Sequence, residues 1–149
     1  MSHKLCRQIQ VELEQMDLLF KRHPGLIEKC RHQAPDNVEI DALAALLHSF
    51  YTGVENIFKR ISLKIDLGLP DGGLWHSELL GNMSHPTKSR PAVISEGLRM
   101  QLRGYMDFRH LFRHAYTLQL NWNKMSGLVL ELEGVYQQFK QELKSFSQS

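Results

Sequence analysis

The sequence predicts an all-α protein, most simply an antiparallel four- to five-helix bundle that forms one domain over residues 1–149. Apolar residues recur every three or four positions in four long segments, as they do on the buried face of a helix. No segment alternates polar and apolar residues for long enough to form a strand. Proline and glycine clusters separate the segments. At 149 residues, with 42% of them hydrophobic, the chain is large enough to bury a core.

The first third of the chain is expected to form one long helix and one short helix. An apolar stripe at helical spacing runs through residues 3–22. The pair Pro24-Gly25 interrupts this stripe, and a second, short helical piece is expected over about residues 26–32.

A capping box predicts the start of the second long helix. Asp36 can accept hydrogen bonds from first-turn amides, and Glu39, three residues later, completes the pattern. The helix is expected to run to about Asp66. Gly53 lies inside it, at a cost of roughly 1 kcal/mol relative to alanine, and predicts a close contact with a neighbouring helix.

The second half of the chain is expected to contain one short and two long helices. The short helix covers residues 75–83. A third long helix is expected to begin near Ser89–Pro91, since Pro91 suits a first helical position, and to end between residues 116 and 120. Asn121 or Asn123 can cap the last long helix. The polar tail, residues 145–149, is expected to be frayed.

The sequence predicts a cytoplasmic protein without membrane contact. No apolar run reaches the roughly 18 residues of a membrane span, and the first residues lack the apolar core of a signal peptide. Cys6 and Cys30 form no metal-binding spacing, and we expect them to be free thiols in a reducing compartment.

The net charge of +2 is unevenly distributed along the chain. Residues 34–87 hold three Lys/Arg against seven Asp/Glu, a balance of −4, whereas residues 88–120 hold six against two, a balance of +4. The basic segment is consistent with an anionic ligand. It is also explained by a basic helix that faces the acidic second quarter of the same fold. Charge alone slightly favours the second explanation.

An arginine interrupts the apolar seam of the third long helix. Burying an unpaired guanidinium costs several kcal/mol, so this arginine, Arg109, needs a partner, a ligand or a function. The seam positions recur at spacings of four and three residues and comprise Leu98, Leu102, Tyr105, Arg109, Phe112 and Tyr116.

The positions around Arg109 define two neighbouring stripes. A helix turns about 100° per residue, which places Arg109, Arg113 and Tyr116 on one stripe and His110 and His114 on the next. Arg109 and His114 are about 140° apart, so one straight helix cannot direct both to one small ligand. Either the helix bends or ends within the motif, or the site is assembled from two copies across a dimer axis.

The residues alone leave three interpretations of this motif open. In the first, the arginine holds an RNA phosphate while a histidine transfers protons, without a metal. In the second, His110 and His114 bind a metal, although nearby ligands are too few and the adjacent arginines would repel it; we therefore expect no metal. In the third, Arg109 pairs with a carboxylate such as Glu55 or Asp66, and the histidines are exposed.

The pattern Arg109-x4-His114-x-Tyr116 resembles the RX4HXY signature of the HEPN superfamily, specifically the HepT-like ribonuclease toxins. The likeness runs from about Val38 to the C-terminal helix. Its other matching segments are residues 47–58, Trp75-His76, residues 90–95 and Asn121-Trp122.

This resemblance implies a helical bundle that dimerises around the motif helix, where two copies of the motif form a composite cleft that cuts RNA without a metal or other cofactor. Arg109 would bind the phosphate, and His114 would be the catalytic histidine. Tyr116 would be the tyrosine that a nucleotidyltransferase-fold antitoxin modifies with AMP in some of these systems. His110 stands where the family commonly has a polar residue, often asparagine. Together with Arg113 it is expected to support RNA binding.

The predicted function is that of a metal-independent endoribonuclease, the toxin component of a toxin–antitoxin pair. Its expected partners are RNA (tRNA or mRNA), the antitoxin and a second copy of the chain. If the seam is also the dimer interface, Arg109 faces its copy at the two-fold cleft. The alternative is a non-catalytic helical protein that binds a nucleotide or a partner in the same cleft, with Arg109 as an ion-pair anchor.

Overall fold

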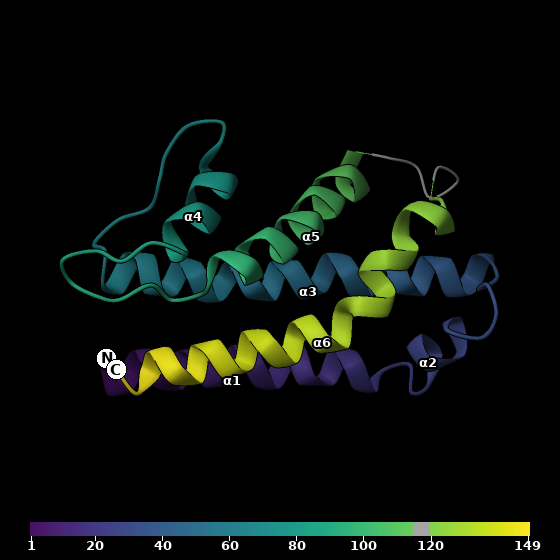
Figure 1. Ribbon diagram of the computed structural model, residues 1–149, viewed down its shortest axis with the longest axis horizontal. Coiled ribbons are helices and arrows are strands. Elements are labelled where there is room, and N and C mark those ends of the chain that lie inside the picture. The colour runs from purple at the N-terminus through teal and green to yellow at the C-terminus, as the bar shows by residue number, and fades with distance from the viewer. Residues whose placement is uncertain (115–119) are drawn as a thin grey trace.

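The computed structural model describes residues 1–114 and 120–149, which form six helices and no strand. Figure 1 shows the long helix α3 running through the centre of the molecule, with α4 and α5 on one side and α1 on the other. Helix α6 begins on the side of α5, crosses α3 and then lies beside α1. The four long helices α1, α3, α5 and α6 alternate in direction along the chain, so the all-α bundle is confirmed. The helices are α1 (His3–Lys21), α2 (Leu26–Cys30), α3 (Asn37–Lys64), α4 (Trp75–Met83), α5 (Glu96–His114) and α6 (Trp122–Ser147).

The first three helices agree closely with the prediction. The capping box at the start of α3 is present: Glu39 N donates to Asp36 Oδ1 at 2.8 Å, and Asp36 N donates to Glu39 Oε1 at 3.0 Å. Gly53 marks the expected close contact, because a Cβ there would lie 2.7 Å from Cγ and Sδ of Met16 on α1. Most of the hydrophobic core is centred on α3, which packs against α1, α4, α5 and α6.

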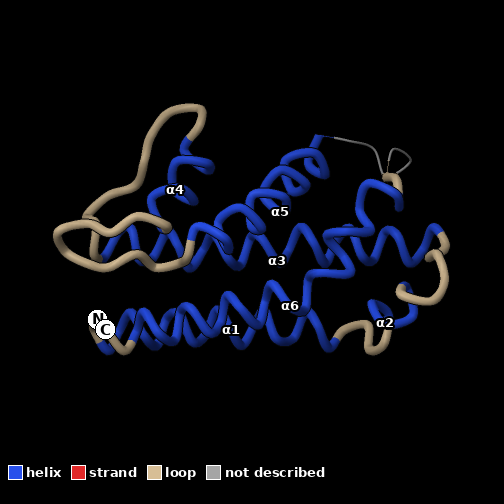
Figure 2. The backbone as a smooth tube through the Cα atoms, viewed as in Figure 1, coloured by secondary structure: helices blue, strands red, loops and turns tan. Residues whose placement is uncertain are grey.

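Helix α5 begins later than predicted, at Glu96 rather than near Pro91. The residues before it are tied to the end of α4, since the N–H groups of Val93 and Ile94 donate to its last carbonyl at 2.8 and 3.1 Å. Both side chains are buried. The Ser95 hydroxyl then accepts from a first-turn amide at 3.1 Å, which is N-cap geometry. Figure 2 shows the long connections on either side of α4.

The last helix begins as predicted and extends further than predicted. Asn121 Oδ1 accepts from Asn123 N at 2.9 Å and caps α6. The helix continues to Ser147, into the segment that we expected to be frayed, and Phe146 is buried there. Tyr105 Oη donates to the Leu128 carbonyl at 2.7 Å and joins α5 to α6.

The structure bears on two general expectations, the state of the cysteines and the presence of a membrane-spanning helix. Cys6 and Cys30 are both free thiols, as predicted. Within residues 1–114 and 120–149, no helix combines the length and apolar character that crossing a membrane requires.

Candidate functional site

Arg109 is buried inside its own chain. The seam of α5 packs on α3, so the guanidinium at the next seam position points toward α3, and the residue is only 3% exposed. Its Nη2 donates to Oε1 of Glu55, another buried residue, at 2.9 Å. Asp66, the other partner considered, pairs instead with Arg90. Both ion pairs join the acidic segment 34–87 to the basic one, as the intramolecular explanation of the charge distribution predicts.

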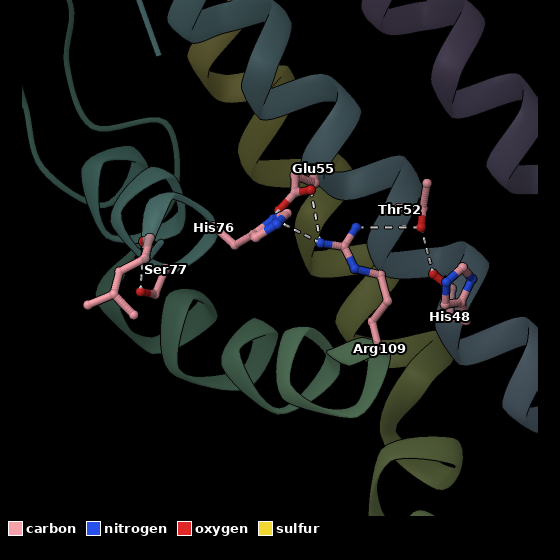
Figure 3. A network of polar contacts seen from close by, with 7 residues as sticks. His48, Thr52, Glu55, His76, Ser77 and Arg109 are labelled. Carbon is pink, nitrogen blue, oxygen red and sulfur yellow. Dashed lines mark hydrogen bonds and ion pairs between the residues drawn. The ribbon is translucent and has the colours of Figure 1, made fainter. Parts of the chain in front are cut away.

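Glu55 holds two groups at once, as Figure 3 shows. Its Oε1 accepts from Arg109, and its Oε2 lies 2.7 Å from Nδ1 of His76, the second residue of α4. The guanidinium also lies 3.5 Å from the Thr52 hydroxyl and 4.9 Å from the centre of the Tyr51 ring. Losing one partner of a buried ion pair costs about 3–5 kcal/mol, so this network ties α3, α4 and α5 together.

The described residues do not accept all the N–H donors of the Arg109 guanidinium. A guanidinium carries five N–H donors. Among the described residues, Glu55 accepts one of them and Thr52 another at the long distance of 3.5 Å. The third contact, 3.3 Å between Nη2 and His76 Nδ1, joins two nitrogen atoms. The described residues therefore leave some donors of Arg109 without an acceptor, and an anion in contact with them could accept these hydrogen bonds.

A basic groove lies beside this guanidinium, between the start of α4 and the outer face of α5. Its volume is about 410 Å³, within the range of small-ligand clefts. Three arginines and two histidines line it against a single carboxylate, which favours an anionic occupant. The lining residues are Gly73, Leu74, His76, Ser77, Arg103, Met106, Asp107, Arg109, His110 and Arg113.

The other motif residues lie on the exposed side of α5. His110 and Arg113 are exposed and line the groove. His114 is also exposed but is absent from the lining, although its ring centre lies 4.6 Å from that of His110. His110 and His114 are therefore neighbours, as expected for the second stripe, whereas Tyr116 of the first stripe lies outside the described residues. In one chain, α5 directs Arg109 into the protein and His114 away from it.

The position of Arg109 differs from the expected arrangement at a two-fold axis. The seam is covered by α3 of the same chain, so Arg109 does not face a second copy across it. The apolar side chains that α5 exposes are Met100 and Leu111, which are 65% and 53% accessible. A contact between motif helices would have to use this other face of α5.

Two further predictions about the motif concern the modification site and a metal site. Tyr116, the expected modification site, lies outside the described residues. In the part of the chain that the structure describes, no group of three or more His, Cys, Asp or Glu side chains is arranged to hold a metal ion.

Burial and the nearby charges shift the pKa values of two side chains next to the network, His48 and Tyr51. Burial lowers the pKa of His48, and the positive charges of Arg113 and Arg109 lower it further. His48 is on α3 and packs against Phe112 with 5.2 Å between the ring centres. Burial also raises the pKa of the Tyr51 phenol, and Glu55 adds to this increase while Arg109 opposes it. Both pKa shifts favour the neutral form of the side chain beside the ion pair.

The sequence indicated Glu55 as one possible partner of Arg109, but it indicated His76 only as part of a segment that resembles the family. A signal for Glu55 was present, because it follows Tyr51 by four positions and precedes Phe58 by three, which places a carboxylate on the buried stripe of α3. For His76 the signal was weaker. The pair Trp75-His76 was noted in the family resemblance, but its distance from Glu55 depends on how α4 docks.

Comparisons with known proteins assign the family. Residues 42–149, well over half of the chain, match the family described as HepT-like protein. The comparison with curated proteins found no match, and neither did the comparison with solved structures. The matched region contains α4, α5, α6 and most of α3, and so it includes the Glu55–Arg109 pair and the groove. The chain belongs to the HepT-like family of the HEPN superfamily.

Proposed function

We propose that the protein is a metal-independent endoribonuclease and the toxin component of a toxin–antitoxin pair. The observation that carries the proposal is Arg109, an arginine that Glu55 fixes at the wall of a basic groove and that has donors without an acceptor among the described residues. Such a guanidinium is already oriented to bind a phosphate. Its attraction to the phosphoryl oxygens becomes stronger as negative charge develops on them during the reaction. The HepT-like family gives this chemistry a context in RNA cleavage.

The proposed reaction is a transesterification within the RNA. The 2′-oxygen attacks the adjacent phosphorus, and the bond from phosphorus to the 5′-oxygen breaks, which gives a 2′,3′-cyclic phosphate and a 5′-hydroxyl end. His114 accepts the 2′-hydroxyl proton, and Arg109 holds the phosphate. Arg113 and His110, both exposed on the groove, support binding of the RNA backbone.

A second copy of the chain completes the proposed site. His114 does not line the groove that contains Arg109, so the histidine of one chain would reach the groove of its partner. Helices α5 would meet through the exposed face with Met100 and Leu111 rather than through the buried seam. The phosphate would then lie between groups from two chains, as in a composite active site.

Regulation is proposed at Tyr116, two positions after His114 in the chain. AMP attached there by a nucleotidyltransferase-fold antitoxin would add a bulky anion near the RNA-binding groups. It would occupy the cleft and repel the RNA backbone.

A cleavage assay tests this proposal. The purified protein is incubated with total RNA and with tRNA, and His114→Ala is compared with His3→Ala, a substitution of an exposed histidine on α1. We expect His114→Ala to abolish cleavage, and to relieve growth arrest in cells, without unfolding the protein, because the side chain is exposed. Cleavage by His114→Ala at the original rate would contradict the assignment. Cleavage should also persist in EDTA, and its complete loss there would favour a metal.

The alternative is a non-catalytic nucleotide- or partner-binding protein. The buried Glu55–Arg109 pair supports this alternative, because it shows that Arg109 has a role in the fold without any substrate. Binding of an RNA or a nucleotide in the groove without any cleavage would favour it over the ribonuclease.

A further inference from the structure

The imidazole of His76 lies between a buried carboxylate and the groove. His76 is in the first turn of α4, and its side chain is 33% exposed, whereas that of Glu55 is 6% exposed. One edge of the ring contacts Glu55, and the same residue lines the groove beside Arg109 and His110. His76 is thus the histidine that combines groove exposure with a buried carboxylate partner within the described residues.

The contact distances assign the proton on Nδ1. A carboxylate is only an acceptor, so an Nδ1–Oε2 distance of 2.7 Å requires that Nδ1 carries a proton and donates it. Arg109 Nη2, 3.3 Å from the same nitrogen, is also a donor, so this contact is not a hydrogen bond. The second ring nitrogen, Nε2, has no hydrogen bond to any described residue and is available to the groove.

The partnership with Glu55 fixes the orientation of His76. A carboxylate that accepts from one ring nitrogen holds the ring in one orientation and leaves the other nitrogen for a ligand. An imidazolium beside a phosphate site can give its Nε2 proton to an oxygen of the ligand. Glu55 would therefore serve two functions, since it anchors the phosphate-binding arginine and orients the proton donor.

We propose that His76 is a second proton-transfer residue of this site and acts as the general acid. The proposal rests on the ribonuclease function proposed above. When the bond between phosphorus and the 5′-oxygen breaks, the leaving oxygen needs a proton to become a hydroxyl. His76 donates that proton from Nε2, while His114 has taken the proton of the attacking 2′-hydroxyl. The two protons balance, and no oxidant, reductant or metal takes part.

The test uses two versions of one RNA substrate. The cleavage site is first mapped with the wild-type protein, and a short RNA with that site is synthesised with either oxygen or sulfur at the 5′-bridging position. A thiolate leaves without protonation, so the sulfur substrate does not need a general acid. The variant is His76→Gln, whose amide can still donate to Glu55 and keep the network intact. The matched control is His32→Gln, which removes an exposed histidine paired with Glu28 on α2.

We expect His76→Gln to cut the oxygen substrate about 100-fold or more slowly than wild type. The sulfur substrate should be cut within a few-fold of the wild-type rate, and His32→Gln should match wild type on both. His114→Ala should be slow on both substrates, because the 2′-hydroxyl still needs a base. Thermal unfolding of each variant reports its folding.

Three results would overturn the inference or its basis, and they are distinguishable. If His76→Gln cuts the oxygen substrate at the wild-type rate, His76 is not the acid, although the ribonuclease function stands. If it is equally slow on both substrates, its role is structural, and the acid assignment is again wrong. If the wild-type protein cuts no RNA, the proposed function itself is wrong, and this inference is lost with it.

Discussion

Two buried arginines in this molecule, Arg90 and Arg109, differ in how many of their N–H donors are hydrogen-bonded to the described residues. Arg90 makes two 2.8 Å hydrogen bonds to Asp66 and three more, at 3.0–3.3 Å, to the carbonyl oxygens of His85, Pro91 and Asn82. All five of its N–H donors are thereby matched. Arg109 is buried to a similar degree, yet the described residues accept only two of its donors, one of them at 3.5 Å.

We interpret this difference as that between a structural arginine and one proposed to bind a ligand. A saturated guanidinium cannot form a further hydrogen bond, so Arg90 fixes the loop between α4 and α5 to the end of α3. Arg109 is held by one carboxylate at the wall of a groove, and the described residues leave some of its donors unmatched. Burial is common to both arginines, and the number of unmatched donors is what distinguishes them.

The largest effects are expected when the carboxylate partner of each arginine is removed, namely Glu55 for Arg109 and Asp66 for Arg90. Glu55→Ala leaves Arg109 buried without its charge partner and releases His76, so we expect a loss of about 3–5 kcal/mol in unfolding free energy and a fall in RNA cleavage of about 100-fold or more. Asp66→Ala should also destabilise, but less, because Arg90 keeps its three carbonyl partners.

Urea unfolding and RNA cleavage per folded molecule measure both effects. The comparison predicts that Asp66→Ala keeps the wild-type cleavage rate once the folded fraction is accounted for. Equal loss of cleavage in the two variants would mean that the two arginines do not differ in function.

A smaller effect is expected at the exposed end of the motif. Arg113 lines the groove without being part of the buried network, so Arg113→Gln should weaken RNA binding by about 1 kcal/mol, or about five-fold, and reduce its salt dependence. Arg99→Gln is the matched control, since Arg99 is on the same helix but pairs with Glu96 outside the groove. Equal effects of the two substitutions on RNA titrations would place the binding surface elsewhere.

Most of the fold could be predicted from local sequence signals. The capping box of Asp36 and Glu39, the break at Pro24-Gly25 and the asparagine cap of α6 each act within a few residues, so sequence spacing suffices to place them. The start of α5 was misplaced because Pro91 is compatible with a helix start. What prevents it is tertiary, namely the hydrogen bonds that hold Val93 and the following residue on the end of α4.

The candidate site was predictable only in part. The seam spacing showed that Arg109 would be directed inward, and a carboxylate on α3 was expected as one possible partner. The choice of Glu55 over Asp66 depends on the relative position of α3 and α5 along their axes, which spacing within one helix does not fix. His76 depends on the docking of α4, 33 positions away from Arg109 in the sequence. The roles of Arg109 and His114 in cleavage stay predictions.

The most direct test of the central claim exchanges each buried arginine for lysine. Lysine keeps the positive charge opposite the carboxylate but lacks the planar array of donors. We expect Arg109→Lys to cut RNA about 100-fold or more slowly and to unfold near the wild-type temperature. Arg90→Lys should lose about 2–4 kcal/mol of unfolding free energy and cut RNA at the wild-type rate per folded molecule. If Arg109→Lys cleaves RNA as fast as wild type, the free donors of Arg109 do not bind the phosphate and the account is wrong.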